Sequence, residues 1–249
     1  MASTPGGVSD DGGLARLHAA LNDRYRGHDT RDWQEWSTFA TADAGEVPLD
    51  AERALLHRVK TSHRGIGERQ ALKHLIAGSA DQAYLDEICT ITGLERLELE
   101  YPVTAKTLDP LRSLTRLRHL SIDSPRHISD FTPVLELPSL TTLLITNAKH
   151  MVDIAWLAGA HHLEVLGIEG SMWTAQKIPT LAPLAGLRGL RAFFATSTRL
   201  GDHDLSPIAE LPRLELLGCA RFAPREEFER LHQRKPDLVC TWFRPEAWT

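Results

Sequence analysis

The six residues Leu94–Leu99, read LERLEL, decide the fold because three equivalent stretches follow them at a fixed distance. The equivalents are Leu117–Ile122 (LRHLSI), Leu140–Ile145 (LTTLLI) and Leu163–Ile168 (LEVLGI). Each begins 23 residues after the one before, since 117 − 94, 140 − 117 and 163 − 140 all give 23. A fixed period of this length is the signature of a stacked repeat solenoid. We therefore predict an α/β solenoid in which each stretch is one short strand of a parallel sheet.

The repeat extends beyond its four regular copies, upstream to Leu72 and downstream to Phe243, which makes about eight candidate strands. Between strands, apolar residues recur every three positions, a spacing typical of a short 3₁₀ or α turn. Each turn follows a residue whose side-chain oxygen can accept a backbone N–H at a helix start. These predicted caps are Thr107, Asp130, Asp153, Thr180 and Asp204.

The combined pattern of strand, cap and helical turn resembles the leucine-rich-repeat proteins. The resemblance covers residues 72–243 and is greatest to the short-unit class of bacterial internalins and of a phosphatase-regulatory subunit. It implies a leucine-rich-repeat horseshoe with a parallel concave sheet, and a protein-binding role. The chain departs from the family at the ninth repeat position, where the family usually has Asn bonding the backbone of adjacent turns. That position holds Pro102, Pro125, Ala148, Ser171, Thr198 and Phe222.

Three segments are expected along the chain: a disordered tail over residues 1–13, a helical N-terminal cap over 14–71, and the solenoid over 72–249. An aromatic stripe in the cap is expected to pack against the solenoid rather than to bind a ligand. Three helices are expected in the cap. The first carries Leu14, Leu17 and Leu21, and the second, capped by Asp29 or Thr30, carries the stripe Trp33, Trp36 and Phe39. The third follows Asp50 and carries Ala54, Leu55, Leu56 and Val59.

Composition narrows the function classes. The 249 residues carry a net charge of −5 without a long basic stretch, so we expect no nucleic-acid partner. No apolar run approaches the roughly 18–20 residues needed to span a bilayer, and the N-terminus lacks a secretory h-region. We therefore expect no membrane partner. Three widely spaced cysteines favour a reducing cytoplasm. The 12 histidines form no metal-binding spacing, so neither a metal nor a cofactor is expected.

Residues that alternate with the buried leucines should line the concave face of the sheet. On the early strands they are charged and on the later strands they are apolar, which predicts a partner site. The alternative is that residues 244–249 fold over the apolar part. The predicted partner-binding residues are Glu98, Glu100, Asp123, Leu144, Val165, Glu169, Trp173, Phe194, Leu216 and Trp242.

One repeat is longer than the others, with extra residues around Trp173. Insertions in solenoids map to loops on one edge, often the binding edge, so Trp173 is a predicted binding hot spot unless its ring folds back onto Ile178. On the same loops, His127, His150 and Lys177 should form a mildly basic ridge.

The function that these patterns favour is a non-enzymatic scaffold that binds another protein through its concave face and the Trp173 loop. One alternative is an inhibitor of an enzyme, of a regulatory or immunity type. A second is an enzyme whose site lies where the cap meets the solenoid. That site would require His57, His63, His74 and Glu98 to converge on one pocket.

Overall fold

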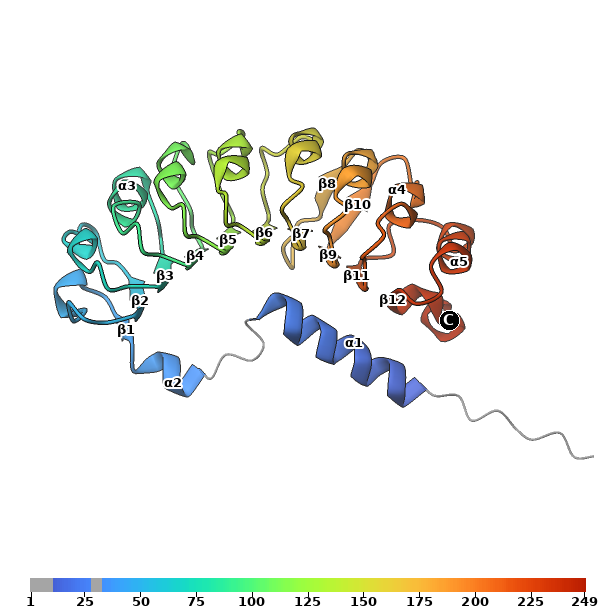
Figure 1. Cartoon of the computed structure of the whole chain (residues 1–249), viewed down its shortest axis with the longest axis horizontal. Coiled ribbons are helices and arrows are strands. Elements are labelled where there is room, and N and C mark those ends of the chain that lie inside the picture. The colour runs from blue at the N-terminus through green and yellow to red at the C-terminus, as the bar shows by residue number, and fades with distance from the viewer. Residues whose placement is uncertain (1–10, 28–32) are drawn as a thin grey trace, which may run out of the picture.

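The computed structural model describes residues 11–27 and 33–249, with side chains over 13–27 and 35–249. Parallel strands stack side by side into one curved ten-stranded sheet, and short helical turns line its convex side (Figure 1). The strands in spatial order are β1 (Ala40–Thr41), β2 (Arg53–His57), β3 (His74–Gly78), β4 (Arg96–Glu100), β5 (His119–Asp123), β6 (Thr142–Thr146), β7 (Val165–Glu169), β9 (Ala192–Ala195), β11 (Leu216–Cys219) and β12 (Val239–Cys240).

The eight strands expected from the repeat are all present, as β3 to β7, β9, β11 and β12, so the leucine-rich-repeat horseshoe is confirmed. Their registers match the repeat; for example Leu97 pairs with Leu120 and Leu120 with Leu143. The leucines of the repeat phrase are almost fully buried in one continuous core between the sheet and the convex turns. Burying about 25 cal/mol per Å² of apolar surface makes this core the main source of stability.

Short helices connect the strands on the convex side. Their predicted caps are confirmed: Asp130 and Asp153, for example, each accept the backbone N–H two residues on, at 2.9 Å. The connecting helices are η1 (Ala44–Glu46), η2 (Ile66–Glu68), α3 (Gln82–Ile88), η3 (Asp109–Ser113), η4 (Thr132–Glu136), η5 (Ala155–Gly159), η6 (Ala182–Gly186), α4 (Ser206–Ala209) and α5 (Arg225–Arg234). After the last strand come η7 (Thr241–Phe243) and η8 (Pro245–Trp248).

The bend after each strand is held without an asparagine ladder. Ser79, Ser124 and Asn147 directly follow their strands and adopt the left-handed backbone conformation, with φ between 53° and 59°. Their backbone N–H groups donate to the last carbonyl of the next strand, as Ser124 does to Thr146 at 2.8 Å. Backbone amides therefore hold the bend where the family uses Asn side chains.

The sheet begins earlier than expected. The helix predicted after Asp50 is wrong, because residues 53–57 form β2, which pairs in parallel with β3. An apolar run such as Ala54–Leu56 is compatible with a buried helix or a buried strand, and pairing with the next repeat decides the case. The offset of 21 residues between Arg53 and its partner His74 fits the repeat.

Two further strands, β8 (Gln176–Ile178) and β10 (Thr198–Leu200), form a small parallel sheet beside the main one. They arise in the long repeat and the repeat after it.

At the C-terminal end of the main sheet, Phe228 of α5, Trp242 and Trp248 pack together over the last strand. This aromatic cluster closes the C-terminal end of the core.

The predicted N-terminal helices are present as α1 (Asp11–Arg26) and α2 (Trp33–Ser37). Trp36 and Phe39 pack against Leu55 and Ile76 on the concave side, which confirms their expected packing role. The tail was expected to extend over residues 1–13, but residues 11–13 belong to helix α1. Residues 1–10, the predicted caps Asp29 and Thr30, and the side chain of Trp33 lie outside what the structure describes.

Candidate functional site

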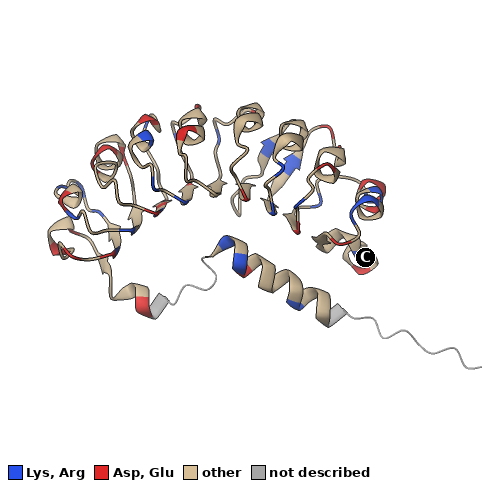
Figure 2. Cartoon of the chain, viewed as in Figure 1, with Lys and Arg blue, Asp and Glu red and all other residues tan. Residues whose placement is uncertain are grey.

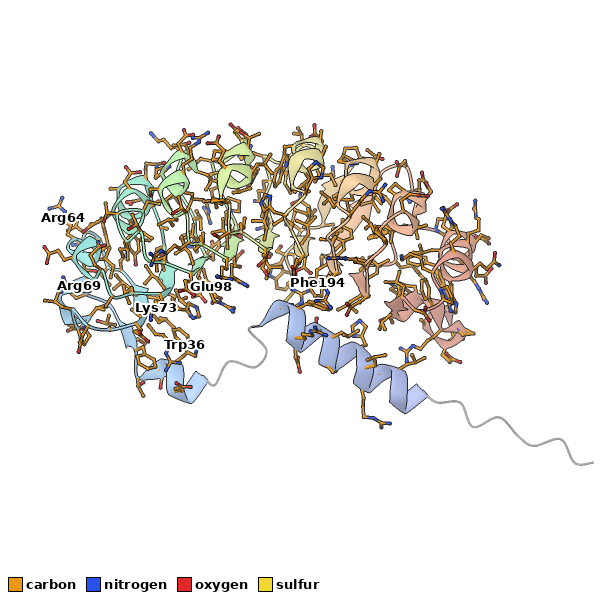
Figure 3. All side chains as sticks on the ribbon, viewed as in Figure 1. Trp36, Arg64, Arg69, Lys73, Glu98 and Phe194 are labelled. Carbon is orange, nitrogen blue, oxygen red and sulfur yellow. The ribbon has the colours of Figure 1, made fainter. Side chains whose placement is uncertain are left out.

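Helix α1 lies across the open concave side of the sheet, beneath the later strands (Figure 1). It contacts β11 and β12, which begin 190 and 213 residues after the last residue of α1 (216 − 26 and 239 − 26). In Figure 3, Phe194 of β9 lies directly above the end of α1. The helix therefore occupies the part of the concave face that the sequence predicts to be apolar.

Beneath α1 is a small apolar cluster that is separate from the main core. We call its sheet residues the concave patch: Leu144, Val165, Ala192, Phe194 and Leu216. Tyr25 of α1 is buried among them, and Leu21 packs at their rim. Phe194 retains only 1% of its exposure. The helix thus covers an apolar surface that the sheet would otherwise expose to water.

Charged groups fix the C-terminal end of α1 to the sheet. The Arg26 guanidinium donates two hydrogen bonds to the Glu169 carboxylate, both at 2.7 Å. The same guanidinium stacks on the Phe194 ring at 4.0 Å from its centroid. Thr196 also donates to Glu169 through its hydroxyl. A bidentate, largely buried pair of this kind specifies orientation as well as adding binding energy.

A second anchor lies one residue earlier. The Tyr25 hydroxyl donates to Glu215 at 2.5 Å, and Arg191 donates to the other oxygen of the same carboxylate. Burial and the hydrogen bond to Glu215 raise the pKa of Tyr25 to about 12. The hydrogen bond from Tyr25 lowers the pKa of Glu215. Tyr25 therefore stays neutral, and its hydroxyl remains a donor at ordinary pH.

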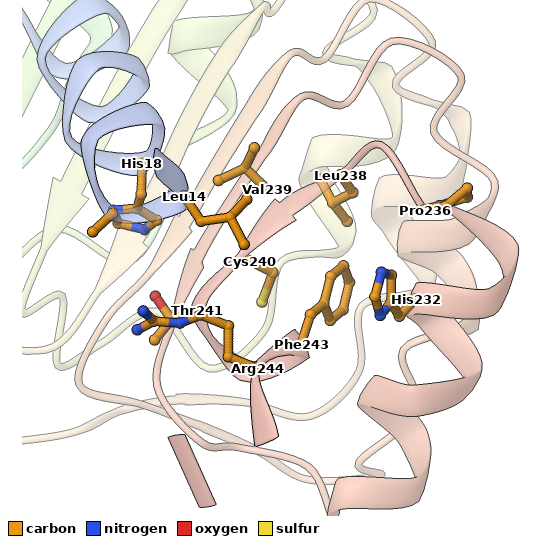
Figure 4. Close-up of a pocket in the computed structure, with 11 residues that line it drawn as sticks. Leu14, His18, His232, Pro236, Leu238, Val239, Cys240, Thr241, Phe243 and Arg244 are labelled. Atoms are coloured by element: carbon orange, nitrogen blue, oxygen red, sulfur yellow. The ribbon is translucent and has the colours of Figure 1, made fainter. Parts of the chain in front are cut away.

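The N-terminal half of α1 packs less tightly against the last repeat than its C-terminal half packs against the sheet. A cleft of about 260 Å³ remains between Leu14 and His18 of the helix and Val239, Phe243 and Arg244 of the last repeat (Figure 4). Leu14 and Leu17 keep 48% and 44% of their exposure. Burial lowers the pKa of His18, and the charges of Arg244 and Arg26 lower it further.

The expectation of an open apolar concave face is therefore corrected. Leu144, Val165, Phe194, Leu216 and Glu169 are buried, since α1 rather than residues 244–249 covers them. The physical reason is that α1 combines an apolar stripe with two side chains, Tyr25 and Arg26, that bind carboxylates of the sheet. The C-terminal residues instead pack at the end of the solenoid. Trp242 belongs to that aromatic end cluster, where its indole N–H donates to the Cys219 carbonyl at 2.8 Å.

The charged residues of the early strands form pairs along the sheet. Glu98 accepts hydrogen bonds from His74 at 2.8 Å and Arg96 at 3.0 Å. Glu100 lies 3.0 Å from His57, and Asp123 accepts from Ser124. Each of these three carboxylates therefore has a polar partner close by on the sheet.

The four residues of the enzyme alternative do not converge. His63 packs against Tyr84 and contacts Arg58, away from the concave pairs of His57 and His74. Within residues 11–27 and 33–249, no three His, Cys, Asp or Glu side chains are grouped so that they could hold a metal ion. Nor does any helix in those ranges have the length and apolar character to cross a bilayer.

The long repeat presents an exposed apolar edge. Trp173 and Met172 keep 89% and 86% of their exposure, so the ring does not fold back onto Ile178. Val152 of the preceding repeat is also exposed. A groove of about 330 Å³ runs beside this edge between the two loops, and it is lined by Lys149, Val152, Thr174, Ala175 and Lys177, among others.

Basic side chains border this edge. Lys177 of β8 and Arg199 of β10 are paired positions, visible as blue ribbon in Figure 2, and both point to solvent with His127, His150 and Lys149. Across the described part of the chain, Lys149, Lys177 and Arg199 have no ion-pair partner. The three residues of the predicted basic ridge, His127, His150 and Lys177, are therefore all exposed to solvent.

The position of α1 on the concave face was not predicted from the sequence. One signal was available: Leu17, Leu21 and Tyr25 recur at four-residue steps, which indicates a helix face that packs against something. The partner of that face is set by the curvature of the sheet, which no local pattern contains.

Neither a protein-family model nor a curated protein matches this chain. Among solved structures, it is similar to internalin F from Listeria monocytogenes, with a TM-score of 0.53 and 20% identity. The similarity supports a leucine-rich-repeat fold for this chain. The match covers 75% of this chain and 52% of that internalin, so the chain spans about half of its length.

Two other leucine-rich-repeat structures are also similar. Internalin C2 from Listeria monocytogenes is 27% identical with a TM-score of 0.49, over 68% of this chain and 72% of that one. A leucine-rich-repeat protein from Leptospira interrogans is 17% identical with a TM-score of 0.47, over 75% of this chain and 53% of that one.

Proposed function

We propose that this leucine-rich-repeat solenoid is a non-enzymatic scaffold that binds another protein, with the Trp173 loop and the concave face as its two binding surfaces. The observation that carries the proposal is the exposed edge of Trp173, Met172 and Val152 beside a groove. Large apolar side chains that stay exposed next to one another are the ordinary mark of an interaction site. An aromatic anchor with a charged rim is the usual composition of a binding hot spot.

The charge around the loop suggests the chemistry of the partner. Lys149, Lys177 and Arg199 are exposed and lack an acidic partner in the residues that the structure describes, although the whole chain carries a net charge of −5. A partner surface with acidic groups around an apolar pocket would complement this edge and would be steered to it.

Affinity capture from the native cell extract, read by mass spectrometry, tests the proposal. The wild-type chain should retain a partner that Trp173→Ala loses by at least about tenfold, the effect of removing a hot spot. Leu49→Ala is the matched control, because Leu49 is also an exposed apolar residue but lies outside the loop. A partner that binds Trp173→Ala as well as it binds wild type would refute the role of the loop.

A further inference from the structure

The concave patch with its two glutamates has the features of a receptor site for a helix. The patch belongs to an apolar cluster distinct from the main core, so the repeats do not need α1 in order to stack. Glu169 and Glu215 point at the helix and accept its Arg26 and Tyr25. The face therefore selects an aromatic hydroxyl followed directly by a guanidinium.

The fit of α1 to this site is incomplete. Its N-terminal half leaves the cleft of about 260 Å³, lined by Val239, Phe243 and other residues of the last repeat. α1 lines this cleft with Leu14, Ala15 and His18, and of these three His18 is the polar side chain, on which the positive charges of Arg244 and Arg26 act. A helix with a larger apolar residue at this place would fill the cleft and remove the unfavourable group.

The covalent link between α1 and the solenoid favours the binding of α1 to the concave patch. A segment joined to the same chain by a short connection acts at an effective concentration on the order of millimolar. A helix of 16 residues has little stability of its own and depends on docking for its order. A free helix that makes the same two anchors and a better apolar contact can therefore replace α1 when it binds well enough to overcome the tether.

We propose that α1 is an exchangeable occupant of the concave patch, and that this site binds an amphipathic helix of a partner protein bearing an aromatic–Arg pair near its C-terminal end. The bound helix places the guanidinium on Glu169 and Phe194 and the aromatic hydroxyl on Glu215. Its preceding turns fill the cleft at Val239 and Phe243. The inference rests on the proposed scaffold function and names the partner chemistry of its concave face.

A labelled peptide of residues 11–27 serves as the probe, and its fluorescence anisotropy is measured on the full-length chain. The receptor is the full-length double variant Tyr25→Ala/Arg26→Ala, in which the tethered helix has lost its anchors and the patch is unchanged. The peptide should bind this variant at least about tenfold more tightly than wild type. A peptide carrying His18→Leu should bind more tightly still.

Four control variants separate the site from nonspecific binding. A peptide with Arg26→Ala, or a receptor that also carries Glu169→Gln, should lose at least about tenfold in affinity. A peptide with Arg16→Ala should bind as the native one does, because Arg16 is exposed. Trp173→Ala in the receptor should leave the peptide affinity unchanged, so failure of the loop proposal and failure of this one are distinguishable.

Hydrogen exchange on the wild-type chain gives a second readout that needs no destabilised variant. The α1 amides should exchange at least about tenfold faster than those of β6 and β7, since α1 opens without unfolding the repeats. Equal affinity of the native and Arg26→Ala peptides would overturn the proposal. So would α1 exchange that matches global unfolding, or a double variant that dimerises by swapping α1.

Discussion

Arg26 and Glu169 form a bidentate ion pair between residues 143 positions apart, with both N–O distances at 2.7 Å. The pair joins a helix outside the repeats to the middle of the concave sheet. Glu169 is buried, and its carboxylate also accepts from Thr196. The ion pair, together with the Tyr25–Glu215 hydrogen bond, thereby fixes where α1 lies on the concave face.

Replacing Arg26 by Ala should release α1 while the solenoid stays folded. Deletion of one member of a buried charge pair weakens an interface by about 2 kcal/mol or more, which corresponds to roughly 30-fold faster exchange of the α1 amides. Hydrogen exchange measures this directly, and the melting temperature of the repeats should remain nearly constant. Arg16→Ala is the control, since it removes the same charge from an exposed position of the same helix.

Tyr25→Phe should weaken α1 docking by about 1–2 kcal/mol, because it removes a hydrogen bond to a charged acceptor. The wild-type chain should also lose this contribution at high pH. The pKa of Tyr25 rises from 10.0 to about 12 on docking, so the bond is complete below pH 10 and is lost as the pH passes through about 12. Ultraviolet titration should show a tyrosine with this pKa that disappears in Tyr25→Phe.

Mild acid should loosen α1. The pKa of His18 lies below its ordinary value of 6.5 in the docked helix, because burial and the charges of Arg244 and Arg26 disfavour the protonated ring. Docking is then at full strength above pH 6.5 and weakens as the pH falls through the lowered pKa. Exchange of the α1 amides, corrected for intrinsic rates, should be faster at about pH 5 than at about pH 7.5. His18→Gln should flatten this dependence; an unchanged slope would argue against the assignment.

Replacing Trp173 or Trp242 by Ala should change the free energy of unfolding by very different amounts. Trp173→Ala should change the free energy of unfolding by less than about 0.5 kcal/mol, because the ring is exposed to solvent. Trp242→Ala should lower it by about 2–3 kcal/mol, since the ring packs on Phe228 and Trp248 and its N–H is bonded to Cys219. Urea denaturation of both variants checks the contrast.

Gly170→Ala should destabilise the long repeat by about 3 kcal/mol, an overpacking effect. A Cβ at this position would lie 2.2 Å from the Ser197 carbonyl oxygen and 2.5 Å from that of Thr174, and both are backbone atoms. Gly159→Ala is the matched control, because its Cβ would meet only the end of Leu135 at 3.7 Å. Thermal denaturation should find this control as stable as wild type; equal losses in the two variants would contradict the argument.

The repeat strands and their caps were predictable because each depends on residues close in sequence. Leu97 and Leu120 specify register by recurring at a constant interval, and Asp130 caps a turn that begins two residues on. Strand β2 was mistaken for a helix because the run Ala54–Leu56 is too short to show a period. The exposed Trp173 edge was predictable as an insertion, since the repeat length itself marks it.

The sequence by itself determined that the chain is a leucine-rich-repeat solenoid, because a period of 23 residues leaves no other way to bury its leucines. It also showed that the later concave strands are apolar. Only the tertiary structure decided what covers them. Arg26 meets Glu169, and Tyr25 meets Glu215, across distances set by the curvature of the whole sheet. That curvature sums small contributions from every repeat, so no stretch of sequence specifies it alone.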